Sequence, residues 1–144
     1  MGARTRCDQR PGADQSELAL AGLTLDTGAL IAGERNDRTF WAFWSETVAR
    51  EIVPVIPAAA LAQAWRGARQ ARLAQIVNAC TVEPLDEALA KTAGELCAKA
   101  KVSDVVDASV VASAARRSDA VLTSDPRDLR RLASHAPGVE IIKL

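Results

Sequence analysis

The sequence predicts an α/β protein, namely a three-layer α/β/α sandwich in which helices cover both faces of a mainly parallel sheet. Three observations support this fold. Short β-branched segments alternate with segments of helical periodicity, which is the pattern of parallel strands joined by crossover helices. Apolar residues make up 49% of the chain and charged residues 25%, as in soluble globular proteins. The 144 residues suffice for one domain with a substantial core.

The first half of the chain is expected to hold two strands and four helices. The strands are predicted at 23–26 and 51–57, and the helices at 27–35, 37–50, 58–67 and 69–79. Pro57 ends the second strand, and Gly67 stops the third helix. Phe40, Trp41 and Trp44 form the apolar stripe of the second helix. We interpret them as core or dimer surface rather than as a platform for RNA bases, and expect their exposed part to receive a partner's helix.

The second half is expected to hold three strands and three helices. The strands are predicted at 80–85, 119–125 and 139–144, and the helices at 87–100, 104–117 and 126–134. Asp86 and Ser103 are suited to cap the first two of these helices, because their side-chain oxygens can accept the free N–H groups of a first turn. Pro126 falls in the first turn of the last helix, where its missing N–H costs nothing.

Residues 1–20 precede a predicted domain of residues 21–144, and they lack the apolar core of a signal peptide. Their composition is that of a disordered arm, or of residues upstream of the true start. No apolar run is long enough to cross a bilayer. The three cysteines have the spacing of neither a disulfide framework nor a zinc site, which favours a reducing cytosol. The single histidine, His135, is expected in a solvated loop. Catalysis with a histidine base is therefore disfavoured, and carboxylates remain for chemistry.

Four aspartates are placed to meet at one edge of the sheet. Asp26 and Asp125 each end a predicted strand, and α/β proteins bind ligands where parallel strands end. Asp104 and Asp107 are three residues apart, so they share one helix face near its first turn. Carboxylates gathered in this way repel one another, and Mg²⁺ or Mn²⁺, which take hard oxygen ligands, removes the conflict. Such an ion can activate water and neutralise a phosphodiester.

Each of these acids also has a purely structural interpretation. Asp26 or Asp125 could simply cap the helix that follows it. Asp107 could be a buried cap or part of an ion pair, and Asp104 could complement the helix dipole. Asp128, in the last helix, is interpreted as a surface residue. The order of the acids, and the elements that carry them, favours a shared site.

Four blocks, LTLDTGALIAGER, VIPAAALAQAWRG, SDVVDASVVASAARR and AVLTSDPRDLRRL, resemble those of PIN domains. The likeness is greatest to the VapC-type toxins of bacterial toxin–antitoxin pairs, and it covers about residues 22–144. It implies a compact PIN-like α/β/α sandwich and an endoribonuclease that depends on Mg²⁺ or Mn²⁺. It also implies RNA as substrate, a homodimer, a VapB-like antitoxin as partner, and a place in the bacterial cytoplasm.

The resemblance can be carried over residue by residue. It implies metal-ligand and catalytic roles for Asp26, Asp107 and Asp125, which match the first, third and fourth acidic positions of the family. Thr123 and Ser124 match the small hydroxyl residues that often precede the last acid, and they are candidates for substrate binding. Asp104 matches no family-wide position but could supply an extra catalytic carboxylate.

One residue departs from the family pattern. Where the second block usually carries glutamate, this chain has Gln63, whose amide can hydrogen-bond but cannot supply a charge or act as a carboxylate base. Either Asp104 or Glu34 compensates, or metal binding and activity are weak. A catalytically weak PIN-fold protein that binds RNA or a partner is therefore the alternative function. An unrelated phosphatase or phosphoacceptor domain would need a lysine near the active edge, and no lysine follows a suitable strand.

Contacts to RNA phosphates must come from local arginine clusters, because the formal net charge is zero. One set is Arg66, Arg69 and Arg72, and another is Arg116, Arg117, Arg127, Arg130 and Arg131. Arg66 and Arg127 are the candidates for substrate binding. The alternative is that these arginines lie on solvated helix faces.

Overall fold

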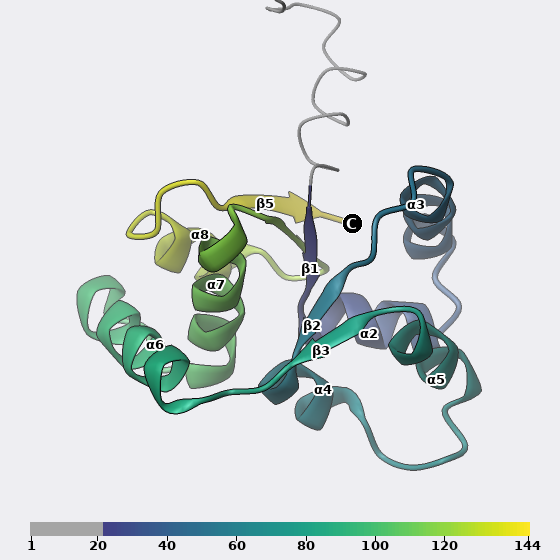
Figure 1. The fold of residues 1–144 in the computed structure, drawn as a ribbon, viewed down its shortest axis with the longest axis horizontal. Helices are drawn as coiled ribbons and strands as arrows, with labels where there is room; N and C mark the ends of the chain where they lie inside the picture. Colours follow the sequence, from purple (N-terminus) through teal and green to yellow (C-terminus); the bar gives the residue numbers. More distant parts are fainter. Residues whose placement is uncertain (1–21) are drawn as a thin grey trace, which may run out of the picture.

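The computed structural model describes residues 22–144, which contain five strands and seven helices (Figure 1). The strands are β1 (Leu23–Leu25), β2 (Val55–Pro57), β3 (Thr81–Glu83), β4 (Ala120–Thr123) and β5 (Glu140–Lys143). The helices are α2 (Thr27–Glu34), α3 (Arg38–Ala49), α4 (Ala58–Ala64), α5 (Ala71–Asn78), α6 (Glu87–Ala100), α7 (Val105–Arg117) and α8 (Arg127–Ala133). The predicted arm, residues 1–20, lies outside the described residues.

All strands run parallel in one sheet of order β3-β2-β1-β4-β5. The first strand is therefore central, and it pairs Thr24 with Val55 on one side and Leu25 with Leu122 on the other. Helices α2 to α5 form one group, and α6 to α8 form another on the opposite side of the sheet (Figure 1). The predicted α/β/α fold is thereby confirmed, and a single apolar core runs through the described residues.

The strands are shorter than predicted. The segment 51–57 becomes a strand only at Val55, and the segment 119–125 leaves the sheet after Thr123. Asp125 therefore lies two residues beyond the end of β4 rather than within it. None of the described helices is long and apolar enough to cross a membrane.

Helix α4 is also shorter than the predicted helix of residues 58–67. It ends at Ala64, and the side chain of Gln70 holds the loop that follows. The Gln70 amide donates a hydrogen bond to the carbonyl of Ala64 over 2.9 Å and accepts the N–H of Gly67 over 3.2 Å. Gly67 has φ +152°, a left-handed region that favours glycine, so the loop turns there.

The prediction that Ser103 caps the helix of residues 104–117 is wrong. Asp104 is the N-cap of α7, and its Oδ1 accepts the N–H groups of Val106 and Asp107, each over 3.0 Å. A carboxylate suits this position because it satisfies two free donors and complements the positive end of the helix dipole. Asp86 caps α6, as predicted.

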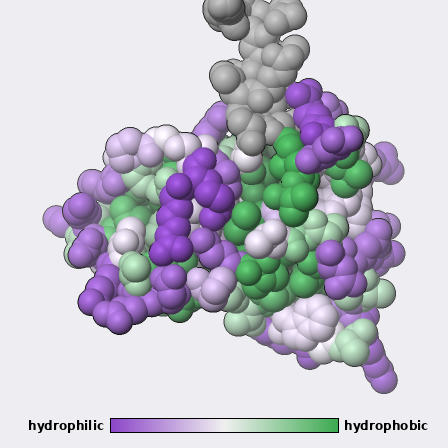
Figure 2. Space-filling model, viewed as in Figure 1, coloured by the Kyte–Doolittle hydropathy of each residue, from purple (hydrophilic) through white to green (hydrophobic). Residues whose placement is uncertain are grey.

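The aromatic stripe of α3 belongs to the core. Phe40 is fully buried and Trp44 is 9% exposed, and their rings stack at 5.9 Å. Trp41 donates its indole N–H to the carbonyl of Gly33 over 3.0 Å. The expectation of an exposed aromatic surface there is therefore wrong. Figure 2 shows a face on which hydrophobic residues gather. The exposed large hydrophobic side chains include Val53 in the loop before β2, Val82 on β3 and Leu85 after β3.

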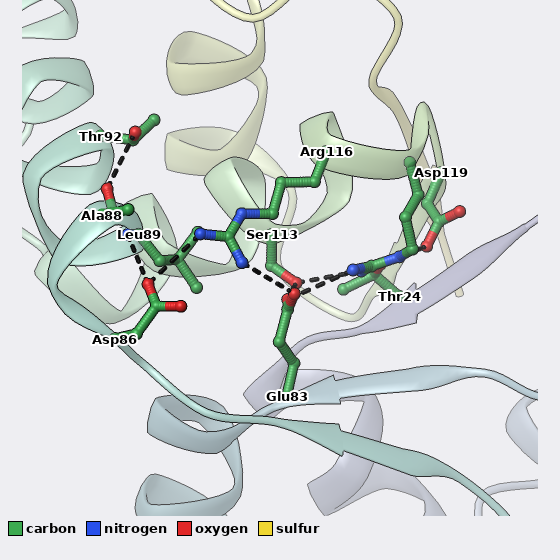
Figure 3. Close-up of polar contacts among 10 residues, drawn as sticks. Thr24, Glu83, Asp86, Ala88, Leu89, Thr92, Ser113, Arg116 and Asp119 are labelled. Carbon is green, nitrogen blue, oxygen red and sulfur yellow. Dashed lines mark hydrogen bonds and ion pairs between the residues drawn. The ribbon is translucent and has the colours of Figure 1, made fainter.

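A network of charged and hydroxyl side chains fixes α7 to the sheet (Figure 3). Arg117 contacts Asp119 over 2.8 Å and Glu83 over 3.2 Å, and donates to the hydroxyl of Thr24 over 3.0 Å. Arg116 contacts Glu83 over 3.1 Å. The network ties the end of α7 to β1 and β3.

Candidate functional site

Asp26 occupies the point where the central strand passes into the first described helix. It follows β1 directly, caps α2, and is 4% exposed. Its Oδ1 accepts the N–H of Ala29 over 2.9 Å, and its Oδ2 accepts the hydroxyl of Thr123 over 2.8 Å. The cap interpretation is confirmed, because Oδ1 accepts an N–H of α2, while Oδ2 is held by the hydroxyl of Thr123 at the end of β4.

The loop after β4 packs closely against the start of α2. A Cβ on Gly28 would lie 2.5 Å from the Ser124 hydroxyl oxygen and 3.2 Å from the Ser124 backbone nitrogen, so only glycine allows this approach. Thr123 is fully buried and accepts the N–H of Asp125 over 2.9 Å while it donates to Asp26. Thr123 therefore connects two of the predicted site residues.

Asp107 lies in the first turn of α7, next to its cap. It is half-buried, whereas Asp104 is exposed. Burial, followed in order by the negative charges of Asp104, Asp26, Asp128 and Asp125, raises the pKa of Asp107 to about 7. The charges that act most strongly on Asp107 are thus all negative, and they come from three separate parts of the chain.

Asp26 is perturbed in the same direction. Burial raises its pKa to about 6, against the opposing effect of the hydrogen bonds from Ala29, Thr123 and Gly28. The charge of Asp125 adds a smaller increase. Two carboxyl groups with pKa values near neutrality in one acidic cluster are the pattern expected of a functional site.

Asp128 also belongs to this cluster, although the sequence predicts that it is a surface residue. It is half-buried, and its charge acts on Asp107. Its contact with Arg131 is long, at 3.9 Å between Nη1 and Oδ1. Asp125 and Asp128 are three residues apart across the start of α8, a spacing that could have indicated a shared face. Asp125 itself is exposed, and its side chain does not cap α8.

The donor set suits a hard divalent cation. Carboxylate oxygens are the preferred ligands of Mg²⁺ and Mn²⁺, and a cation would offset the repulsion that raises the two pKa values. Beside Asp26, the hydroxyl oxygen of Thr27 is buried without a hydrogen-bond partner, the only such side-chain atom in residues 22–144. An orphaned hydroxyl next to a carboxylate is a place for an ordered water or a metal-bound water.

The carboxylates are not yet arranged as a set of ligands. Within residues 22–144, no three aspartate, glutamate, histidine or cysteine side chains are close enough to hold one ion. The residues therefore fit a cation in kind, and at least one aspartate side chain must turn inward to bind it. Asp125 is the candidate for this movement because it is exposed and its carboxylate makes no hydrogen bond with residues 22–144.

Gln63 lies on α4, which contacts both α2 and α7. It lines a hollow of about 250 Å³ together with Glu34 and Arg35 at the end of α2, and with Arg66 after α4. Glu34 is also engaged by α5, because its Oε1 accepts the N–H of Leu73 over 2.8 Å. No aspartate lines this hollow.

The predicted arginine clusters separate into two kinds. Arg116 and Arg117 belong to the network of Figure 3, and Arg131 donates to the carbonyls of Ala100 and Lys101 at the end of α6. Arg127, Arg130, Arg66, Arg69 and Arg72 are exposed, and of these Arg66 donates to the carbonyls of Ala62 and Trp65 and Arg72 to that of Glu34. The sequence-predicted clusters thus combine arginines that stabilise the fold with exposed ones that can contact phosphates.

Comparison with known proteins gives a family and a set of similar folds. The model of the family described as PIN domain matches residues 23–134. No significant relative was found among curated proteins. The structure is similar to that of VapBC2 from Rickettsia felis bound to a DNA fragment from its promoter. Identity is 12% and the TM-score 0.65, and the match covers 85% of this chain and 98% of that one.

Two further structures have the same fold. One is FitAB bound to the IR36 DNA fragment, with 19% identity and a TM-score of 0.61 over 84% of this chain and 94% of that one. The other is FitAcB from Neisseria gonorrhoeae, with 15% identity and a TM-score of 0.61 over 84% and 96%. At these identities the likeness concerns the fold, and the acidic cluster of this chain has to be interpreted from its own residues.

Proposed function

This chain belongs to the PIN domain family, and we propose that it is the toxin of a toxin–antitoxin pair, an endoribonuclease that uses Mg²⁺ or Mn²⁺. The observation that carries the proposal is the convergence of Asp26 and Asp107 in one acidic cluster, with their pKa values raised to about 6 and about 7. Such a cluster is costly to the fold unless a cation or a proton compensates it. RNA is the substrate class that fits a toxin of this family.

In this proposal, each side chain of the cluster has a separate task. Asp26, Asp107 and Asp125 hold the cation, and Asp104 adds a carboxylate from the cap of α7. The bound cation supplies a water of lowered pKa and positive charge for the phosphodiester oxygens. Thr123 orients Asp26 through the hydrogen bond from its hydroxyl. Ser124 and the exposed Arg127 lie on the loop and helix that follow β4, where they are placed to contact the RNA backbone.

The partner is proposed to be a VapB-like antitoxin, because structures of the same fold include complexes named VapBC2 and FitAB. An apolar hollow of about 410 Å³, lined by Leu61, Trp65 and Val77 among others, offers a surface for it. Trp65 is 38% exposed, and exposed aromatic side chains in hollows are typical of binding surfaces. We also propose a homodimer, and the bacterial cytoplasm as the place of action, since RNA and the antitoxin are found there.

The test is cleavage of single-stranded RNA by the purified chain with Mg²⁺ or Mn²⁺, compared with an EDTA control. Asp107→Asn should abolish cleavage, because it removes a ligand charge but keeps the shape of the side chain. Unchanged cleavage by this variant would refute the assignment. Co-expression with the protein encoded by the adjacent gene should yield a complex, and Trp65→Ala should weaken it.

One observation favours the alternative, a catalytically weak protein that acts by binding RNA. The described carboxylates are not close enough to hold an ion as they stand, and Gln63 supplies no charge. This alternative predicts RNA binding without cleavage at millimolar Mn²⁺, and a binding constant that EDTA does not alter.

A further inference from the structure

The hollow that contains Gln63 differs in chemistry from the acidic cluster. Its lining includes the half-buried Ile31, and Leu73 is fully buried beneath it. The lining also includes Gln63, Arg35 and Arg66, with Glu34 beside them. The planar guanidinium groups of Arg35 and Arg66 can stack on an unstacked base, and the amide and carboxylate can hydrogen-bond to its edge.

The side chains around the hollow differ in the hydrogen bonds and ion pairs that they already form. Gln70, in the same wall, has both ends of its amide committed to the loop after α4. Arg66 donates through Nη1 to the carbonyls of Ala62 and Trp65, which fixes its direction. Within residues 22–144, the amide of Gln63 makes no hydrogen bond and the guanidinium of Arg35 no ion pair. These two side chains are therefore free to bind a ligand.

The size of the hollow limits the ligand. Its volume of about 250 Å³ lies below the roughly 300–1,000 Å³ of pockets that enclose drug-sized molecules. A single nucleobase fits this limit, and a dinucleotide cofactor does not. Arginine pairs with O6 and N7 of guanine, and glutamine pairs with N6 and N7 of adenine, so the rim suits a purine.

The hollow is also within reach of the acidic cluster. Helix α2 joins them, with Asp26 at its cap and Glu34 at its last residue (Figure 1). Eight residues of helix advance about 12 Å along the axis. Stacked nucleotides advance about 3.4 Å each, so a strand bound at Asp26 reaches the hollow within about four nucleotides.

We propose that the hollow between α2, α4 and α5 binds one unstacked purine base of the RNA, close to the phosphodiester that is cleaved, with Gln63 and Arg35 contacting its edge. This inference rests on the proposed function, and it gives Gln63 a role that a glutamate could not fill, because an amide can both donate and accept toward a base. The hollow would then set the sequence preference of cleavage, while the aspartates would hold the cation that cleavage requires.

The experiment measures binding separately from cleavage. Fluorescence anisotropy is recorded with labelled A12 and U12 strands, and with an A12 strand that carries abasic sites. The protein carries Asp107→Asn, so that the strands stay intact. We expect A12 to bind about five- to tenfold more tightly than U12 or the abasic strand. Gln63→Ala or Arg35→Ala should reduce this preference to less than about twofold.

Matched controls separate the hollow from general charge effects. Gln75→Ala removes another exposed glutamine, and Arg38→Ala another exposed arginine, and neither residue lines the hollow, so both variants should keep the preference. Equal affinity for purine, pyrimidine and abasic strands would overturn the proposal, as would a preference that survives Gln63→Ala. If the wild-type protein shows no base preference but Gln63→Ala or Arg35→Ala weakens antitoxin binding, the hollow is a protein contact and the proposal is overturned.

The outcome is distinguishable from failure of the proposed function. A wild-type chain that prefers purines but cuts no RNA would support the hollow and refute the nuclease. A chain that cuts RNA with Mn²⁺, with no dependence on the base at any position near the cut, would support the nuclease and refute the hollow. The abasic strand removes the base and leaves the protein unchanged. The comparison of strands therefore does not require the Gln63 and Arg35 variants to fold.

Discussion

The hydroxyl of Thr123 donates a hydrogen bond to Oδ2 of Asp26 over 2.8 Å, between residues 97 positions apart in the sequence. Both side chains are buried, and Thr123 also accepts the N–H of Asp125. This single hydroxyl therefore sets the position of one carboxylate and the path of the loop that carries another.

Thr123→Val tests this role, because valine keeps the shape and loses the hydroxyl. Removing a group that orients a metal ligand lowers affinity or activity about 10- to 100-fold. We expect such a loss in Mn²⁺ affinity by calorimetry and in the rate of RNA cleavage. Thr92→Val is the matched control, since the Thr92 hydroxyl donates only to the carbonyl of Ala88 on an exposed helix face. Equal effects of the two variants would contradict the role.

Asp107→Asn should stabilise the metal-free protein at high pH while it abolishes cleavage. The pKa of this carboxyl is about 7, against an ordinary value of 3.8, so its ionised form destabilises the fold. The cost is absent below about pH 4, grows as the pH rises, and is complete above about pH 7. The variant should melt a few degrees higher at pH 8, and the difference should shrink towards pH 5.

Adding Mn²⁺ provides the control for that measurement. The wild type should gain thermal stability, because the ion binds only the folded state, and Asp107→Asn should gain much less. A variant that melts below the wild type at pH 8 in EDTA would show that the Asp107 carboxylate contributes to stability rather than opposing it.

Mn²⁺ affinity should fall as the pH is lowered from 8 to 6. Asp26 and Asp107 have pKa values of about 6 and about 7, so protons compete with the ion in this range. Calorimetric titrations in two buffers of different ionisation enthalpy would reveal proton release on binding near pH 6.5. An affinity that is constant from pH 6 to pH 8 would place the metal on other groups.

Asp104→Asn and Asp128→Asn should each reduce cleavage less than Asp107→Asn. Asparagine preserves the cap of α7, because its amide oxygen can still accept the N–H groups of Val106 and Asp107. Both changes remove a negative charge that acts on Asp107, so both should lower the pH at which activity reaches half of its maximum. A complete loss with Asp128→Asn would make it a ligand.

Arg117→Met should destabilise the fold without affecting metal binding. The side chain of Asp119 is 6% exposed, and removing Arg117 leaves its charge with only the Thr24 hydroxyl (Figure 3). Breaking such a pair costs about 2–4 kcal/mol, measured by urea unfolding. Arg116→Met, at a more exposed position with 37% of its side chain accessible, should destabilise the fold much less than Arg117→Met, because ion pairs in water contribute little. Unequal Mn²⁺ affinities would indicate that the network also shapes the site.

The sequence was sufficient to predict the fold class and the elements near whose ends Asp26 and Asp107 lie. Periodicity reveals element type and order, and the spacing of acids reveals which elements end together. It could not assign Asp128 to the cluster, because that depends on how α8 packs against α7. Nor could it reveal the hollow that Gln63 lines, which depends on where α4 ends and how α5 packs against α2. The buried state of Phe40 and Trp44 was equally undetermined, since an apolar stripe fits a core and an interface alike.

The central place of β1 has a consequence for the timing of synthesis. Among residues 22–144, β1 is the first strand to be translated, yet its neighbour β4 and the Thr123 hydroxyl come from the last quarter of the chain. At roughly 5–20 residues per second, a ribosome needs about 5 to 20 s to add the 97 residues that separate Asp26 from Thr123. A nascent chain therefore cannot assemble the acidic cluster until translation is nearly finished. If the proposed antitoxin is made first, it is therefore present before the first complete acidic cluster forms.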